Sequence, residues 1–303
     1  MTDFNLKLVT VKDQYKTYKE NKITREKEII SAQNQPIDHW WYNIWPDHGV
    51  PENVDLFNDF VTLLVADIKL HKYNTLVHCS AGVGRTGTLL VILYFKLKNK
   101  TPTLDEITDQ IILMRTNHRM YQVQSDVQLG FIYKFFKIRH DSKLITQEFT
   151  KLNILIKPSI CDKYNLDRYS NIYATETILI TEIALQNNDT DTICKKYVNA
   201  SIMPDFIDEN NNIINKVFAS ECPNEKTKNR FLQLLKDYKI GRIIMLTNLM
   251  ENGKEKCNDY TTAGLPGSKS VKVFLPLKTS TDEQYGYKTK YILVRNNDNL
   301  ELI

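Results

Sequence analysis

The sequence lacks the features that mark membrane, secreted and metal-binding proteins. No apolar run approaches the roughly 20 residues that span a bilayer, and the N-terminus has no basic-then-apolar signal peptide pattern. The five cysteines are an odd number without paired spacing, which predicts free thiols in a reducing, cytoplasmic compartment. The six histidines do not cluster with cysteines at ligand spacing, so we predict no metal site and no cofactor. A net charge of +4 is too small and too scattered to favour nucleic acid.

What the chain does contain is typical of a soluble α/β protein. Its 303 residues are 42% hydrophobic and 25% charged, which suits one large domain or two small ones. Apolar periodicity and capping signals predict helices over Val54–Ile68, Thr103–Arg115, Ser125–Phe136 and Lys228–Tyr238. Runs of Val, Ile and Leu predict strands at Asn74–His78, Thr177–Ile183, Arg242–Thr247, Val271–Leu275 and Thr289–Arg295. Because these elements interleave, we expect an α/β fold, with a boundary in the polar stretch His140–Gln147.

The strongest functional signal is the string from Val77 to Gly87, which lies between an apolar strand and an apolar helix. A loop at a helix N-terminus directs unpaired backbone N–H groups at one spot, and the helix dipole favours an anion there. Glycines let such a loop curl closely around the anion. The candidate phosphate-binding residues of the loop are Ser80, Ala81, Gly82, Val83 and Gly84.

The same string contains the candidate catalytic groups. The field of the loop favours the reactive thiolate of Cys79 near neutral pH. Arg85 offers a planar, two-pronged donor to phosphate oxygens, and Thr86 stands where a hydroxyl could hydrogen-bond the sulfur. His78 is assigned a supporting role. The alternative is a buried structural cysteine; it is common for an isolated Cys-x5-Arg, but the complete string in a strand–loop–helix setting disfavours it.

This string resembles the signature of the protein tyrosine phosphatases, specifically of their phosphotyrosine-specific group. The resemblance implies the Cys-x5-Arg tyrosine phosphatase fold, a central twisted mixed sheet flanked by helices. It also implies hydrolysis of phosphotyrosine in proteins or peptides through a cysteinyl-phosphate on Cys79. The segment from Trp45 to Pro51 resembles the mobile acid loop of this family, which makes Asp47 the expected general acid and Trp45 its support. Taken alone, such a segment is more often only a turn.

Three further segments resemble family motifs. In Val123–Gln128, Gln124 corresponds to the residue that orients the hydrolytic water, and Gln128 either contacts substrate or caps the next helix. Asp167–Tyr169 resembles the Asn-Arg-Tyr recognition loop, whose tyrosine stacks on the substrate ring and makes the slot too deep for phosphoserine. Glu251 and Lys256 match a hairpin in which the Glu braces the phosphate-binding Arg and the Lys meets the acid loop; alone, they read as solvated charges.

Several positions depart from the family pattern. Asn171 stands where an Asp often grips the peptide backbone, which predicts weaker peptide affinity. Ala219–Pro223 differs from the usual Ala-Ser-Gln-Gly-Pro at two residues, and Leu232 stands where a Trp is usual. The interval from Arg115 to Gln124 is one residue longer than usual. These changes predict altered packing near the site.

The motifs also occur in an unusual order, with a catalytic half (1–140) before a recognition half (141–303). One interpretation, which we favour, is a permuted single domain in which both halves close into one site. The other is a slice of a tandem receptor-like or viral phosphatase, supported by the similarity of Asn5–Val9 to Val271–Leu275. In that case two chains could exchange halves in a homodimer.

Two other functions are compatible with parts of the sequence. A phosphotyrosine-binding module with weak turnover would result if the split fold misplaced Tyr169 or Asp47. A dual-specificity or lipid phosphatase fits the phosphate loop alone, but Tyr169 and the lack of a strongly basic loop disfavour it. The abundance of Ile, Lys and Asn suggests an AT-rich genome, and for a virus-encoded enzyme the location would be the host cytoplasm.

Overall fold

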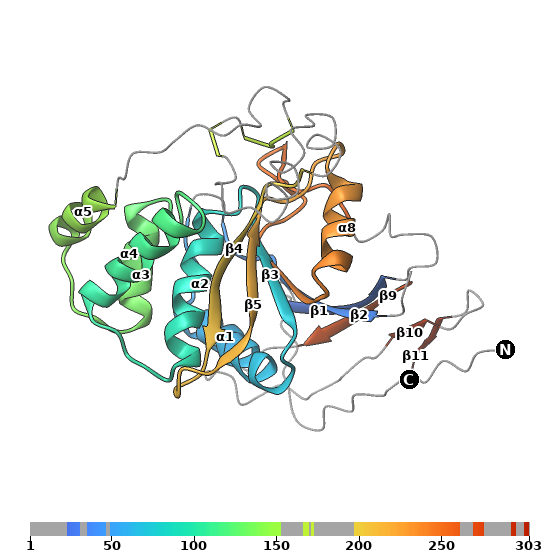
Figure 1. The fold of residues 1–303 in the computed structure, drawn as a ribbon, viewed down its shortest axis with the longest axis horizontal. Helices are drawn as coiled ribbons and strands as arrows, with labels where there is room; N and C mark the ends of the chain where they lie inside the picture. Colours follow the sequence, from blue (N-terminus) through green and yellow to red (C-terminus); the bar gives the residue numbers. More distant parts are fainter. Residues whose placement is uncertain are drawn as a thin grey trace, which may run out of the picture.

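The computed structural model describes residues 23–30, 35–46, 49–152, 166–169, 171–172, 197–260, 269–275, 292–294 and 300–302 (Figure 1). Its helices are α1 (Val54–Leu70), α2 (Gly84–Leu97), α3 (Leu104–Asn117), α4 (Asp126–Phe135), α5 (Ser142–Lys151) and α8 (Lys228–Asp237). Its strands are β1 (Ile23–Ile30), β2 (Gln35–Tyr42), β3 (Asn74–His78), β4 (Ala200–Ile207), β5 (Ile213–Ser220), β6 (Ile240–Met245), β7 (Met250–Glu251), β8 (Lys254–Glu255), β9 (Lys269–Leu275), β10 (Ile292–Val294) and β11 (Leu300–Leu302). None of these helices has the length and apolar character to cross a membrane.

A mixed sheet forms the centre of the molecule. Its seven strands run in the order β4-β5-β3-β6-β2-β1-β9. Strand β3 is parallel to both β5 and β6, and β6 is parallel to β2, whereas β1 and β4 pair with their neighbours antiparallel. Helices α1 to α4 pack on one face of this sheet and α8 packs on the other (Figure 1). Each face is covered by one cluster of buried apolar side chains. The predicted α/β fold with a mixed sheet flanked by helices is therefore confirmed.

The sheet combines strands from both halves of the sequence. Strand β3 comes from the first half, and its neighbours β5 and β6 come from the second. Leu76 is paired with Phe218 of β5 and with Ile243 of β6. Parallel strands end at the same edge of a sheet, so the loop that follows β3 is placed beside the segments that follow β5 and β6.

Local signals account for where the predicted helices begin. Thr103 accepts a hydrogen bond from the amide of Glu106, whose carboxylate accepts one from the amide of Thr103, so the predicted capping box is present. Ser125 caps α4 through the amide of Gln128. The polar stretch predicted as a boundary contains the start of α5, which Asp141 caps.

The strand predictions had mixed success. The predicted strand at Asn74–His78 is β3, and those at Arg242–Thr247, Val271–Leu275 and Thr289–Arg295 overlap β6, β9 and β10. Thr177–Ile183 lies outside the described residues. Strands β1, β2, β4 and β5 were not predicted, because their charged and polar residues obscure the apolar runs.

Candidate active site

The loop between β3 and α2 wraps around the sulfur of Cys79. Cys79 is a free thiol with only 5% of its surface exposed, and its Sγ accepts a hydrogen bond of 3.2 Å from the amide of Gly82. Gly82 has a φ of +72°, and a Cβ there would lie 2.2 Å from the carbonyl oxygen of Ser220. Only glycine allows this left-handed turn against the end of β5. The sequence therefore folds residues 79–84 into a curled loop before the N-terminus of α2, called the cup below, in which the amide of Gly82 is directed at the sulfur.

Two buried side chains hold this cup from outside. Arg119 donates from Nε to the carbonyl oxygen of Gly82 at 3.0 Å and from Nη2 to that of Ala81 at 2.9 Å. Gln122 donates to the same oxygen of Gly82 at 3.0 Å. Because the carbonyl of Ala81 is bound outside the loop, the N–H of the same peptide unit points inward, toward Cys79. Sequence reasoning missed Arg119 and Gln122, which lie in no recognisable motif.

Arg85 is held in a fixed orientation at the first turn of α2. Its Nη1 and Nη2 donate to the two carboxylate oxygens of Glu251 at 2.7 and 2.6 Å, and Nη1 also donates to the carbonyl oxygen of Leu246 at 2.9 Å. Burial would raise the pKa of Glu251, but the hydrogen bonds from Arg85 and Asn248 outweigh it and hold that pKa below its usual value. Glu251 thus stays ionised and fixes the plane of the Arg85 guanidinium through two hydrogen bonds.

The glutamine segment lies against the start of α2. A Cβ at Gly84 would lie 2.9 Å from Nε2 of Gln128 and 3.2 Å from Oε1 of Gln124, so both amides reach this glycine. The backbone amide of Gln124 donates to Oε1 of Gln128 at 2.8 Å. The capping box predicted here is therefore only half formed: Ser125, the N-cap, accepts from the amide of Gln128, but the Gln128 side chain accepts from Gln124, the residue before the cap.

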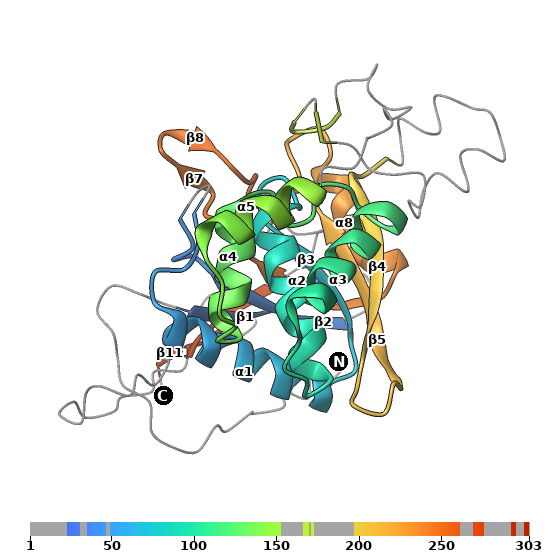
Figure 2. The same ribbon diagram turned by 90° about the vertical axis from the view of Figure 1, so that its left-hand side faces the viewer.

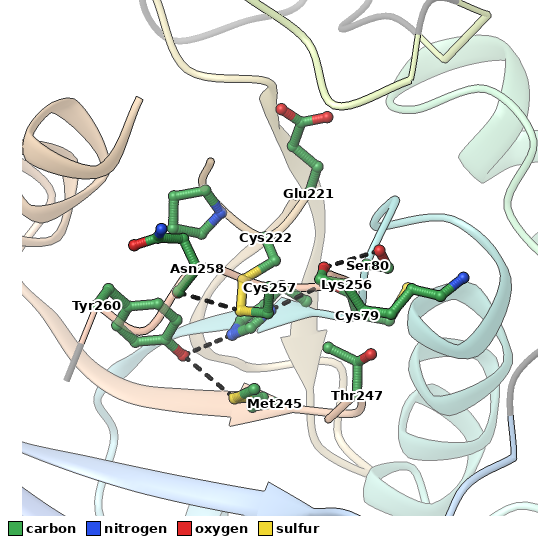
Figure 3. Close-up of a disulfide and its surroundings, with 12 residues drawn as sticks. Cys79, Ser80, Glu221, Cys222, Met245, Thr247, Lys256, Cys257, Asn258 and Tyr260 are labelled. Atoms are coloured by element: carbon green, nitrogen blue, oxygen red, sulfur yellow. Dashed lines mark hydrogen bonds between the residues drawn. A yellow bond between two sulfur atoms is a disulfide. The ribbon is translucent and has the colours of Figure 1, made fainter. Parts of the chain in front are cut away.

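The recognition tyrosine reaches the residue next to the nucleophile. Oγ of Ser80 lies 2.7 Å from the hydroxyl of Tyr169 and donates to the carbonyl oxygen of Lys256 at 2.8 Å, a bond drawn in Figure 3. Since the one hydroxyl hydrogen of Ser80 goes to that carbonyl, Tyr169 is the donor between the two hydroxyls. Residues 166–169 and 171–172 and the β7–β8 hairpin lie at the same end of the molecule (Figure 2).

The base of the acid loop is fixed, although Asp47 itself lies outside the described residues. Trp45 is buried and donates from Nε1 to the carbonyl oxygen of Gly49 at 3.0 Å, and the amide of Gly49 donates to Pro46 at 3.2 Å. The indole packs edge-on against Phe57, with ring centres 5.2 Å apart. The two ends of the loop are thereby held together by a turn and by the core.

The remaining predicted residues have unequal surroundings. Thr86 is fully buried, and its hydroxyl has no hydrogen-bond partner within the described part of the chain. Lys256 is buried and contributes its carbonyl to Ser80. Val83 is buried at the start of α2, where its carbonyl accepts from the amide of Val123. Asn171 is exposed.

His78 belongs to a buried chain of rings behind the cup. Its Nδ1 lies 3.2 Å from the carbonyl oxygen of Cys79, its Nε2 lies 2.6 Å from the hydroxyl of Tyr260, and that hydroxyl lies 2.9 Å from Nε2 of His39. Burial lowers the pKa of His78 to about 3, so the ring is neutral. A carbonyl can only accept, so Nδ1 carries the proton, Tyr260 donates to Nε2, and His39 donates to Tyr260. Tyr260 was not predicted.

The prediction of free thiols is wrong for two cysteines. Cys222 and Cys257, 35 residues apart in the sequence, form a disulfide with a Cα–Cα distance of 5.1 Å (Figure 3). The spacing of the cysteines gave no sign of this pair, because the packing of the segment after β5 against the segment after β8 brings them together. The two sulfurs and a ring nitrogen of His78 also lie within 4.8 Å of one another, a grouping that the sequence did not reveal. Cys161 and Cys194 lie outside the described residues.

The structure brings together the free thiol of Cys79, the amide of Gly82 that donates to it, and the buried guanidinium of Arg85 at the start of α2. The family described as "Protein-tyrosine phosphatase" matches residues 1–137 and 163–301. The chain belongs to this family, which confirms the resemblance seen in the sequence and makes the chain, by family, a protein-tyrosine phosphatase.

Three similar proteins are named receptor-type tyrosine-protein phosphatases. Receptor-type tyrosine-protein phosphatase S of Gallus gallus is 27% identical over 275 residues, which cover 77% of this chain and 17% of that protein. Type F of Homo sapiens is 27% identical over 272 residues, covering 77% of this chain and 13% of that protein. Type eta of Homo sapiens is 35% identical over 138 residues, covering 42% and 10%. The chain thus spans less than a fifth of these relatives, and no solved structure matches it significantly.

Proposed function

We propose that this chain hydrolyses phosphotyrosine in proteins or peptides through a cysteinyl-phosphate on Cys79. The observation that carries the proposal is the contact between Tyr169 and Ser80, which sets an aromatic ring beside the residue that follows the nucleophile. Family membership supports the same reaction. The reaction needs a free thiol at Cys79, and the described disulfide joins Cys222 to Cys257 and leaves Cys79 free.

In the first step the thiolate attacks phosphorus. The substrate phosphate binds the amides of the cup, residues 80–84, together with the guanidinium of Arg85. The new P–S bond forms as the bond from phosphorus to the tyrosyl oxygen breaks, and Asp47 gives that oxygen a proton. Glu251 supports this step by holding Arg85 in a two-pronged orientation before substrate arrives.

In the second step water displaces the sulfur. Gln124 orients the water and Asp47, now ionised, accepts its proton, while Gln128 contacts the bound phosphate. Thr86 donates a hydrogen bond to the departing thiolate, a role supported by its buried hydroxyl with no other partner in the described residues. Both glutamines lie at Gly84, next to the phosphate position.

Selectivity for phosphotyrosine follows from the depth of the site. Cys79 is almost fully buried, and the partly buried Tyr169 contacts Ser80 beside it, so in this proposal the ring of Tyr169 forms a wall of the slot. A phosphoserine is shorter than a phosphotyrosine, so its phosphorus would not reach the sulfur. The exposed Asn171, without a charge to grip the peptide backbone, is consistent with modest peptide affinity.

We further propose that residues 1–140 and 141–303 close into one catalytic domain, with the family's segments in permuted order. This is supported by three contacts within one chain: β3 between β5 and β6, Ser80 with Tyr169, and Arg85 with Glu251. With these contacts made inside one chain, an exchange of halves between two chains is not required for a complete site.

The test compares the wild type with Cys79→Ser on p-nitrophenyl phosphate and on matched phosphotyrosyl and phosphoserine peptides. We expect the wild type alone to hydrolyse p-nitrophenyl phosphate and the phosphotyrosyl peptide, and we expect neither protein to cleave the phosphoserine peptide. Equal background rates for both proteins would contradict catalysis and leave a phosphotyrosine-binding module. Equal cleavage of the phosphoserine peptide would contradict the selectivity.

A further inference from the structure

One residue of the recognition loop and one residue behind it carry carboxyl groups where the family motifs have amides. Asp167 stands at the Asn of Asn-Arg-Tyr, and Glu221 stands at the Gln of Ala-Ser-Gln-Gly-Pro. The structure brings these two replacements together. Nδ2 of Asn199 donates to Oδ1 of Asp167 at 3.0 Å and to Oε2 of Glu221 at 3.3 Å, so the two carboxyl groups share one donor.

Glu221 is bonded directly to the backbone of the recognition loop. It is 2% exposed, and its side chain points away from Cys222 and the disulfide (Figure 3). The backbone amide of Arg168 lies 3.2 and 3.1 Å from its two oxygens. Arg168 is also held by its side chain, which donates to the carbonyl oxygens of Cys222 and Pro223 at 3.3 and 2.9 Å. Since Tyr169 follows Arg168, Glu221 lies one residue from the ring that walls the slot.

The charged groups around Glu221 connect it to the cup. Asp167, Arg119 and Arg168 act on it electrostatically, and Tyr197 donates its hydroxyl to Asp167 at 2.6 Å. Arg119 connects these groups to the cup, because it donates to Oδ1 of Asn199 at 2.7 Å and also to the carbonyl oxygens of Ala81 and Gly82. Burial and the nearby Asp167 raise the pKa of Glu221 well above its usual value, although Arg168 and Arg119 oppose the rise.

We propose that Glu221 is a positioning residue for substrate recognition: it keeps its proton beside Asp167, and with that proton in place it holds the backbone of Arg168 so that Tyr169 reaches Ser80. The inference rests on the proposed function, in which Tyr169 walls the phosphotyrosine slot. Glu221 is buried and Asp167 is half-buried, and both accept from Nδ2 of Asn199, so the charge of Asp167 opposes ionisation of Glu221. Loss of the proton of Glu221 therefore pushes the loop, which carries Asp167, away from it.

The direction of the pH effect follows from this linkage. With the loop docked, Glu221 binds its proton more tightly than it would with the loop lifted, when water enters and Asp167 departs. The stabilisation of the docked loop is therefore complete below the ordinary pKa of a glutamate and is lost as pH rises through the raised pKa. We expect KM for a phosphotyrosyl peptide to rise with pH over this range, and kcat of the bound complex to change less.

The experiment measures KM and kcat for one phosphotyrosyl peptide across pH in the wild type, Glu221→Gln and Asp167→Asn. In the wild type this ionisation raises KM by about three- to tenfold, since one unit of pKa difference is tenfold in the docking equilibrium. In Glu221→Gln the rise is absent, and in Asp167→Asn it moves to lower pH. Ionisation of the substrate phosphate is common to all variants and cancels when their profiles are divided.

The matched control is Glu255→Gln. Glu255 is an exposed carboxylate on the β7–β8 hairpin that binds the same Arg168 side chain at 3.1 Å. Its loss removes a charge beside the recognition loop and leaves Glu221 and Asp167 unchanged. We expect its profile to keep the shape of the wild type. A Glu221→Gln profile parallel to the wild type would overturn the proposal, as would equal changes of shape in Glu221→Gln and Glu255→Gln.

A binding measurement separates this inference from the proposed function. In a Cys79→Ser background, calorimetry in two buffers gives the protons taken up when the peptide binds. Greater uptake with Glu221 than in the Glu221→Gln variant supports the inference even if the wild type turns out to have no turnover, and equal uptake overturns it. Should Glu221→Gln fail to fold, as judged by thermal melting, the pH shift in Asp167→Asn decides.

Discussion

The phosphate loop and the recognition loop meet at Ser80, yet they are built in opposite ways. The phosphate loop is continuous from Cys79 to Arg85, and its shape follows from one strand end, one left-handed glycine and one helix start. The recognition loop is positioned by distant segments: Glu221–Pro223, Glu255 and Asn199. A loop built from consecutive residues tolerates little change, because in the proposed function its residues all bind the phosphate, whereas a loop held by distant segments can exchange the residues that support it. The replacements at Asp167 and Glu221 are of the second kind.

The largest effect is expected at the acid loop, which serves the chemistry of the phosphate loop alone. Asp47→Ala should lower kcat by about 10²- to 10⁴-fold, because the tyrosyl oxygen then leaves without a proton. Affinity for a phosphotyrosyl peptide should persist, as measured by calorimetry in a Cys79→Ser background. Full activity of Asp47→Ala would exclude Asp47 as the acid.

The Cys222–Cys257 disulfide joins two of the segments that hold the recognition loop, so its removal measures how much that link stabilises the fold. Cys222→Ala should lower the free energy of unfolding by about 2–4 kcal/mol, because the bond closes a long loop in the unfolded chain. Urea denaturation of oxidised protein measures the loss. Cys257→Ala is the matched variant, and the double variant should lose no more than either single one. Additive losses would show that the two cysteines do not act as a bond.

The hydrogen bonds between Arg85 and Glu251 link the phosphate loop to the β7–β8 hairpin. Glu251→Gln should lower kcat/KM for p-nitrophenyl phosphate by about ten- to a hundredfold, because a neutral amide offers one acceptor where the carboxylate offers two. Steady-state kinetics checks this. Glu255→Gln, on the same hairpin but exposed, should have a far smaller effect. Similar losses in both variants would mean that the hairpin as a whole, not the brace, is disturbed.

The smallest effect is expected at the contact between the two loops. Tyr169→Phe keeps the aromatic wall and removes only the hydrogen bond to Ser80, which should raise KM for a phosphotyrosyl peptide by about three- to tenfold. Tyr169→Ala removes the wall as well and should raise KM further. An unchanged KM in both variants would exclude Tyr169 from the substrate slot.

Sequence reasoning reached the parts of the site that are local. The cup around Cys79 and the caps at Thr103 and Ser125 depend on contacts within a few residues, so their patterns appear in the sequence. Arg119 and Tyr260 were missed because their partners lie far away in the chain and no spacing marks them. The Cys222–Cys257 disulfide was missed for the same reason.

The amino-acid sequence by itself determined that a thiol stands at a helix N-terminus with an arginine in the first turn, because backbone geometry and the helix dipole act over a few residues. Which side chains complete that site was decided by the sheet. Placing β3 between β5 and β6 brings Glu251 to Arg85 and Ser220 against Gly82, and burial of the sheet faces fixes that order. Packing of this kind sums many weak contacts between distant segments, and no local pattern of residues encodes it.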